Sequence, residues 1–125
     1  MAGIFLWNKT ESFNPDEINR VFQDLDYRPG KHLEYNDWNV IVFPKSSYDI
    51  CNYIIADDGI ICGTGTFGYK GKVYEQALPC IYEDIKNDRL NLEGLWGSFL
   101  IFCSIYNKTI LIRDGAMLAR LHGIR

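Results

Sequence analysis

The chain has 125 residues, about the size of one domain, and 47% of them are apolar, which favours a globular fold and excludes a disordered chain. The formal charge of −3, with Lys and Arg scattered along the sequence, argues against nucleic-acid binding. No stretch reaches the about 20 apolar residues of a membrane-spanning helix, and the first residues lack the pattern of a secretion signal. We therefore expect a cytoplasmic protein with a single domain, residues 1–125.

The cysteine pattern indicates buried thiols. Four cysteines are spread along the chain without a Cys-x-x-Cys pair: Cys51, Cys62, Cys80 and Cys103. Three of them fall inside apolar, strand-like runs, where a free cysteine behaves as a small hydrophobic side chain. Zinc needs clustered ligands, and the only histidines are His32 and His122. We therefore predict no metal site.

The N-terminal part predicts a strand followed by a helix. Residues 3–7 form a short apolar run before a polar turn, which is typical of a first strand. Asn14 as N-cap and Pro15 at the first helical position predict a helix over 14–25. Four apolar residues then recur at helical spacing: Ile18, Val21, Phe22 and Leu25. We expect this stripe to pack on one face of a sheet.

The middle of the chain is rich in β-branched and aromatic residues. Residues 38–44, 50–56 and 60–69 predict three strands. Asp57-Asp58-Gly59 is typical of a tight turn, so the second and third strands should form a hairpin. We assign the two aspartates to that turn rather than to acid/base chemistry.

The strand over 60–69 contains Gly63, Gly65 and Gly68. They do not match a nucleotide-phosphate loop, because Lys70 is not followed by Ser or Thr. Glycines inside a strand instead predict a bulge or a close approach of two backbones. Three tryptophans also occur near or in predicted strands, and we expect them in the core: Trp7, Trp38 and Trp96.

The C-terminal part predicts a helix and a hairpin. Four residues at helical spacing predict a helix over 73–87, beginning or kinked at Pro79: Ala77, Ile81, Tyr82 and Ile85. Two apolar runs within 97–114 flank Asn107 and predict a β-hairpin. The resulting order is β, α, β, β, β, α, β, β. Short turns between neighbouring strands favour an α+β fold with largely antiparallel sheets.

Three segments form a pattern when they are taken in order. The first is the N-terminal Met-x-Gly-Ile-Phe strand, and the second is the glycine-rich CGTGTFGYKG before a helix. The third is LEGLWGSFLIFCSIYNKTILIRD, whose motif positions are Leu95, Gly97, Phe99, Asn107, Arg113 and Asp114. As a set, these segments resemble the class II glutamine amidotransferase domain, which forms the N-terminal half of asparagine synthetase.

The resemblance covers most of the chain and is best at residues 3–5 and 90–114. It implies an N-terminal-nucleophile (Ntn) hydrolase-like αββα sandwich, in which two antiparallel sheets face each other and helices cover the outer faces. The alternating residues of 98–105 agree with this, because both faces of that strand are largely apolar. Family domains continue beyond the Arg-Asp pair, so we expect the sandwich to be incomplete at its C-terminal end. The chain would then be the N-terminal part of a longer or split protein, or a short stand-alone relative whose sheets a partner completes.

The residues that carry the family's chemistry are replaced in this chain. In the family, an N-terminal cysteine attacks the side-chain amide of glutamine, and here Ala2 occupies that position. The family's Asn-Gly-Glu, which grips the substrate, corresponds to Thr64-Gly65-Thr66, without a carboxylate. Glu75 is the nearest, poor candidate for the acidic residue that binds the substrate's amino group. No histidine close in sequence could activate Cys62 or Cys103.

The resemblance also implies a structural motif near the family's domain interface. Gly97 suits a strand that enters a crowded contact, and Arg113 and Asp114 correspond to a structural ion pair. We expect these three residues to serve structure or an interface.

Our leading hypothesis is a catalytically silent amidotransferase-like domain, a pseudoenzyme that acts as a scaffold, partner-binding or substrate-positioning module. Its partner would be an asparagine-synthetase-like enzyme that forms amide bonds, as in peptide or natural-product biosynthesis. We expect no cofactor in this chain, and ATP and Mg only in the partner synthetase domain or subunit. Two alternatives remain: an active glutaminase in which the nucleophilic cysteine was replaced by Ala2, and a stand-alone homo-oligomeric binding protein of the same fold.

Overall fold

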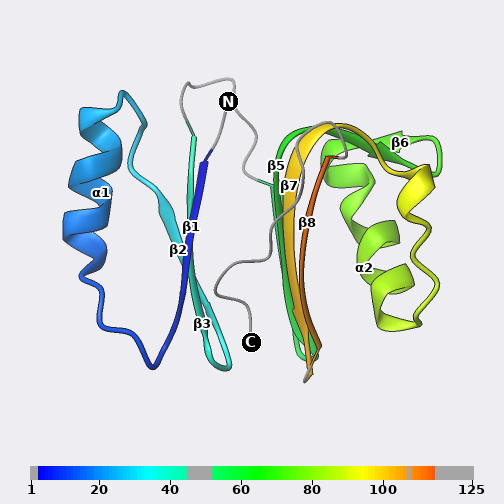
Figure 1. Cartoon of the computed structure of the whole chain (residues 1–125), viewed down its shortest axis with the longest axis horizontal. Coiled ribbons are helices and arrows are strands. Elements are labelled where there is room, and N and C mark those ends of the chain that lie inside the picture. Colours follow the sequence, from blue (N-terminus) through cyan, green and yellow to red (C-terminus); the bar gives the residue numbers. More distant parts are fainter. Residues whose placement is uncertain (1–2, 45–51, 107, 115–125) are drawn as a thin grey trace. The chain divides into compact units, whose positions relative to one another are not determined.

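The computed structural model describes residues 3–44, 52–106 and 108–114. The chain divides into two compact units, Met1–Cys51 and Asn52–Arg125, and each is described by itself (Figure 1). All strand pairings among the described residues are antiparallel, and each unit combines a sheet with a helix. The predicted α+β class with largely antiparallel sheets is therefore confirmed. No helix in these ranges is long and apolar enough to cross a membrane.

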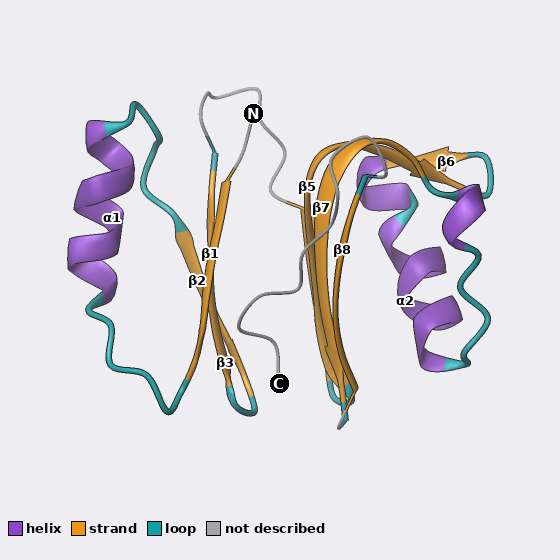
Figure 2. Ribbon diagram, viewed as in Figure 1, coloured by secondary structure: helices purple, strands orange, loops and turns teal. Residues whose placement is uncertain are grey.

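The first unit is a three-stranded sheet with a helix over one face (Figure 2). Its elements are β1 Gly3–Asn8, α1 Pro15–Asp24, β2 Lys31–Tyr35 and β3 Trp38–Phe43. The strand order is β1-β3-β2. Strand β3 takes the central place because its apolar run from Val40 to Phe43 is fully buried on both faces.

Helix α1 begins where the sequence predicts. The Asn14 side chain accepts a hydrogen bond from the Asp16 N–H at 2.9 Å, which satisfies one of the free donors of the first turn. Ile18 is buried, and the Phe22 ring stacks on the Phe43 ring with centroids 3.9 Å apart. These contacts hold the helix on the sheet and confirm half of the predicted stripe.

The prediction is wrong for the other half of the stripe, because Val21 is 56% exposed and Leu25 is 58% exposed. The packed row of α1 is centred on Ile18 and Phe22, so Val21 lies at its flank. Leu25 follows Asp24, the last residue of the helix, and its backbone is no longer helical.

Strand β2 was not predicted from the sequence. It carries charged or polar residues at most positions, and Leu33 is its only fully buried side chain among Lys31–Tyr35. It forms a hairpin with β3 through Asn36, whose φ is 48°. An edge strand with so little apolar alternation gives a weak sequence signal.

The second unit is a larger antiparallel sheet in the order β4-β5-β7-β8, with β6 added beside β5. Its strands are β4 Asn52–Ala56, β5 Gly59–Tyr69, β6 Lys72–Val73, β7 Trp96–Ile105 and β8 Lys108–Arg113. Its helices are η1 Tyr74–Gln76, α2 Leu78–Lys86 and η2 Leu92–Gly94. The predicted β4–β5 and β7–β8 hairpins are confirmed, although Asn107 lies outside the described residues.

The predicted helix over 73–87 is divided. A short 3₁₀ helix, η1, precedes α2, which begins next to Pro79 because proline lacks an N–H but fits the first helical turn. The predicted apolar positions of this segment are buried against the sheet: Ala77, Ile81, Tyr82 and Ile85. The sheet contributes alternate residues of β7 to the same core: Phe99, Ile101, Cys103 and Ile105.

The opposite face of this sheet is also apolar. Ile60 and Cys62 of β5 and Phe102 of β7 lie there, and all three are fully buried. The expectation for the tryptophans is confirmed for Trp7 and Trp38, each 6% exposed, but it is wrong for Trp96, which is 52% exposed.

Trp96 lies outside the core because its register partner on β5 is Gly68. The Trp96 ring fills the space where a Cβ of Gly68 would stand, so the indole packs against the backbone at the end of the sheet.

Candidate functional site

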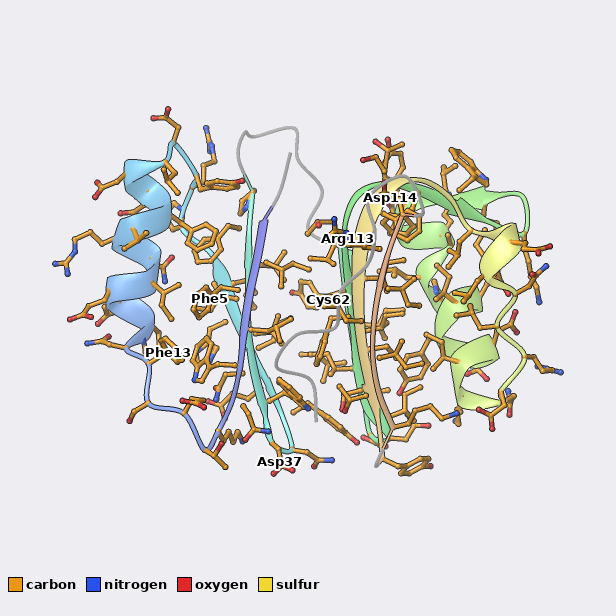
Figure 3. All side chains as sticks on the ribbon, in the orientation of Figure 1. Phe5, Phe13, Asp37, Cys62, Arg113 and Asp114 are labelled. Atoms are coloured by element: carbon orange, nitrogen blue, oxygen red, sulfur yellow. The ribbon has the colours of Figure 1, made fainter. Side chains whose placement is uncertain are left out.

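The residues that the sequence singles out come together at one end of the second unit's sheet. The register pairs Thr64 with Leu100 and Gly65 with Phe99. On the other side of β7, Leu100 pairs with Arg113. Figure 3 shows Arg113 and Asp114 near one end of this sheet. The degenerate Thr64-Gly65-Thr66 strand and the Arg113–Asp114 pair are therefore separated by one strand.

Two glycines with positive φ lie in the contact between β5 and β7 at this end. Gly65 has φ +90°, and a Cβ there would overlap the carbonyl oxygen of Ser98. Gly97 has φ +115°, and its Cβ would overlap the carbonyl oxygen of Thr66. Both positions require glycine for conformation and for space. The prediction of close backbone approach in the glycine-rich strand is confirmed for Gly65, whereas Gly63 and Gly68 face the rings of Phe67 and Trp96. The prediction of a crowded contact at Gly97 is confirmed.

Asp114 closes the end of the β7–β8 ladder. Its N–H donates to the Phe99 carbonyl oxygen at 3.3 Å, and its carboxylate accepts from the Phe99 N–H at 3.3 Å. Phe99 is also the register partner of Gly65 on β5. The Asp114 carboxylate therefore fixes β7 at the residue that lies opposite Gly65. Asp114 therefore has a structural role in the unit, while the family-type ion pair with Arg113 stays a prediction.

An apolar groove of about 570 Å³ lies beside these residues, and we call it the edge groove. One wall comes from the segment that contains η2, and the other from β7 and β8. Its apolar lining is Leu90, Leu92, Leu95, Phe99, Ile110, Leu111 and Ile112, and Gly97, Arg113 and Asp114 border it. The sequence does not predict this groove: the leucines of 90–95 indicate an apolar segment, but not the strands that complete the groove.

The two cysteines in the sheet are not suited to nucleophilic chemistry. Burial raises the pKa of the Cys62 thiol to about 12 and that of the Cys103 thiol to about 12. A thiol with such a pKa holds almost no thiolate at neutral pH. Both behave as the small buried hydrophobic residues that the sequence predicts, and Cys80 on α2 is half-buried.

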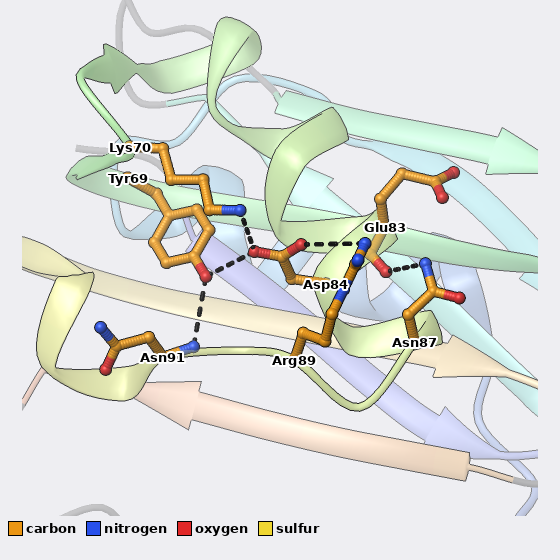
Figure 4. A network of polar contacts seen from close by, with 7 residues as sticks. All are labelled: Tyr69, Lys70, Glu83, Asp84, Asn87, Arg89 and Asn91. Carbon is orange, nitrogen blue, oxygen red and sulfur yellow. Dashed lines mark hydrogen bonds and ion pairs between the residues drawn. The ribbon is translucent and has the colours of Figure 1, made fainter.

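A buried carboxylate organises the other side of the unit (Figure 4). Asp84 of α2 is 3% exposed. It accepts a hydrogen bond from the Tyr69 hydroxyl at 2.7 Å, and Lys70 Nζ lies 2.8 Å from the same oxygen. The Tyr69 hydroxyl in turn accepts from the Asn91 N–H at 3.2 Å. This network ties the end of β5, α2 and the segment before η2 together.

A second carboxylate clamps the β4–β5 turn to α2. Asp58 accepts from the Tyr82 hydroxyl at 2.5 Å and lies 2.5 Å from Lys86 Nζ. The assignment of this aspartate to a hairpin turn is confirmed. The Lys86 ammonium and the Tyr82 hydroxyl lower the pKa of Asp58, and the Lys70 ammonium and the Tyr69 hydroxyl lower the pKa of Asp84.

Acidification is expected to destabilise the second unit through Asp58 and Asp84. Their folded pKa values lie below the unfolded value of about 3.9, so the ion pairs stabilise the fold fully above that pH. This stability is lost as the pH falls through the folded values. Urea unfolding between pH 6 and pH 2.5 should show a falling midpoint, and Asp84→Asn should start lower at pH 6 but fall less.

Glu83→Gln provides the matched control, because Glu83 is the exposed neighbour of Asp84 on α2. Its midpoint should follow the wild-type curve at every pH. An Asp84→Asn curve that runs parallel to the wild type would contradict a role of Asp84 in acid unfolding.

Several predicted positions do not join the site. Ala2 lies outside the described residues, as do Cys51 and His122. Glu75 is exposed in η1. Within 3–44, 52–106 and 108–114, no cluster of three or more His, Cys, Asp or Glu residues could hold a metal ion. Comparisons with protein-family models, curated proteins and solved structures find no match.

Proposed function

We propose that this chain is a catalytically silent glutamine-amidotransferase-like domain that serves an ATP-dependent, amide-forming synthetase as a scaffold or substrate-positioning module. The observation that carries the proposal is the convergence of the resembling segments. Thr64-Gly65-Thr66, Gly97 and Arg113–Asp114 come from separate parts of the sequence and lie on neighbouring strands at one end of one sheet. Such convergence supports a common origin for the motifs.

The proposal includes the αββα sandwich of the Ntn hydrolases. Two features of the separate units support it. In each unit a helix covers one face of an antiparallel sheet. The other face is apolar, with Leu33, Val40 and Val42 in the first unit and Ile60 and Phe102 in the second. Apolar sheet faces of this kind are what the two inner layers of a sandwich require.

The residues at the convergent end support a silent domain rather than a glutaminase. At the position of the family's glutamate stands Thr66, an exposed hydroxyl residue. Gly65 and Gly97 face backbone carbonyl groups of the neighbouring strand, which leaves no room for a side chain at either position. The pKa of about 12 for Cys62 argues against a substitute nucleophile. Structural packing therefore explains this end better than substrate chemistry does.

The partner in this proposal is an asparagine-synthetase-like domain or subunit that binds ATP and Mg. This chain would contribute a binding surface to the complex and would catalyse no reaction itself. A synthetase encoded beside this chain is expected to co-purify with it.

Restoring the family's nucleophile tests the silent-domain proposal. Purified Ala2→Cys protein, with removal of Met1 checked by mass spectrometry, is incubated with glutamine, and ammonia is measured by a coupled enzyme assay. We expect no release above that of the unchanged chain, because a nucleophile alone does not supply the missing grip on the substrate.

Thr66→Glu in the Ala2→Cys background extends the experiment, since it adds the missing carboxylate. Ammonia release by Ala2→Cys alone would contradict the proposal and favour a glutaminase that has lost only its cysteine. Release by the double variant alone would support a substrate strand that has degenerated.

A further inference from the structure

Within the described part of the chain, strand β8 lies at one edge of the second unit's sheet. Among the described residues it pairs with β7 only, and the sheet order ends with it. Natural edges are usually protected by charge, proline or a bulge, but the centre of β8 is the uncharged Thr109-Ile110-Leu111-Ile112. This edge is therefore suited to pairing with another strand.

A hollow accompanies β8 over its whole length. The edge groove borders it from Ile110 to Asp114, and a second hollow of about 350 Å³ continues along Lys108 and Ile110. Leu92, on the wall of the edge groove, is 62% exposed. The apolar surface beside the edge can thus accept side chains from an added strand.

The direction of the backbone groups can be deduced from the hydrogen bonds at Asp114. Its N–H points at β7, where it donates to Phe99. Hydrogen-bonding directions alternate along an antiparallel strand, so the same direction holds for Ile112 and Ile110. The N–H and C=O groups of Leu111 and Thr109 then point away from β7, toward the open side.

Side-chain pairing favours one register for a second copy of this strand. When two β8 strands run antiparallel with Leu111 opposite Leu111, each Lys108 lies opposite an Asp114 of the other copy. Within one chain the Lys108 ammonium contacts Asp88 and the Ile85 carbonyl oxygen, so the new pair would exchange or share these contacts. Ile110 then lies opposite Ile112, so apolar residues face apolar residues. Shifting the centre to Ile110 would instead place Lys108 opposite Ile112, which pairs a charge with an apolar side chain.

We propose that two copies of this chain associate through their β8 strands, antiparallel, with Leu111 at the two-fold axis. The outward backbone groups of Leu111 form hydrogen bonds across the axis. The paired Ile110 and Ile112 side chains, together with Leu92, fill the edge grooves of both copies. The two sheets become one continuous sheet. The inference does not depend on the silent-amidotransferase proposal.

The test measures mass and proximity in the full chain. Sedimentation equilibrium should give a species of twice the 14.5 kDa chain mass. Leu111→Lys should weaken dimerisation about tenfold or more, because it puts like charges face to face on the axis. Ile55→Lys is the control on the opposite edge strand, β4, where Ile55 is 51% exposed, and it should leave the dimer unchanged.

Cysteine crosslinking tests the register without relying on a destabilising change. Directly opposite, hydrogen-bonded residues have Cα atoms about 5.5 Å apart, within disulfide range. Leu111→Cys should therefore give a disulfide-linked dimer on mild oxidation. Thr109→Cys should give no disulfide-linked dimer, because residue 109 lies opposite Arg113 of the other copy. The unchanged chain should give none either.

Three results would overturn the proposal. The first is a full chain that stays monomeric at high concentration. The second is a dimer that survives Leu111→Lys and yields no Leu111→Cys crosslink. The third is a dimer that forms only when residues 115–125 are removed, because the chain's own last residues would then compete for the edge.

Discussion

Replacing Gly97 with alanine is expected to destabilise the protein by about 3 kcal/mol or more, a large part of the about 5–15 kcal/mol that folds a typical domain. The φ of +115° alone costs a residue with a Cβ about 1–2 kcal/mol. The new Cβ must also push the Thr66 carbonyl away, and that carbonyl belongs to backbone held by the β5–β7 pairing. Urea unfolding followed by circular dichroism measures the loss.

Gly94→Ala is the matched control for this substitution. Gly94 lies in η2, three residues before Gly97, and a Cβ there would meet its neighbours at 3.4 Å, an ordinary contact distance. We expect a change within about 0.5 kcal/mol. Gly65→Ala should behave like Gly97→Ala, because its Cβ would overlap the Ser98 carbonyl from the other strand. A Gly97→Ala protein as stable as Gly94→Ala would refute the close strand contact.

Phe43→Ala is expected to destabilise the first unit by about 3–5 kcal/mol. Phe43 is fully buried and stacks on Phe22. Its ring also fills the space beside Gly30. Removing the ring leaves a cavity between α1 and β3, which the short three-stranded sheet can close only in part. Phe13→Ala, which removes a 47% exposed ring at the start of α1, should cost much less.

The same experiment tests the prediction of a single domain. If residues 1–125 fold as one domain, Phe43→Ala lowers the midpoint of one cooperative transition. Two separate transitions, with only one displaced by the substitution, would mean that the two compact units are independent domains.

The sequence predicts most of the fold where local and long-range preferences agree. Helix α1 has an N-cap, a proline and an apolar stripe that all indicate the same element. The hairpin of β7 and β8 follows from two long apolar runs. Strand β2 is missed because Leu33 is its single buried residue, so its sequence shows no apolar alternation. Leu33 lies beside Val40 of β3, and this pairing is not visible in the sequence of β2. How many apolar residues of α1 are packed also depends on the position of the sheet, and the sequence of the helix does not specify that position.

The candidate site could be predicted in part. The positions of Thr64, Gly65 and Gly97 follow from motifs, and glycines inside a strand by themselves indicate a close backbone contact. Their register is a long-range property, because a shift of β7 by one residue would move Gly97 to the other face. The edge groove could not be predicted, since it forms between the leucines of 90–95 and a strand that follows them by some fifteen residues.

The exposed indole of Trp96 also has an optical consequence. Two tryptophans, Trp7 and Trp38, are buried in the first unit, whereas Trp96 is open to solvent in the second. Acrylamide should quench the emission of Trp96 first and leave the emission of the buried pair. Native fluorescence can thus distinguish the two halves of the chain without an added label.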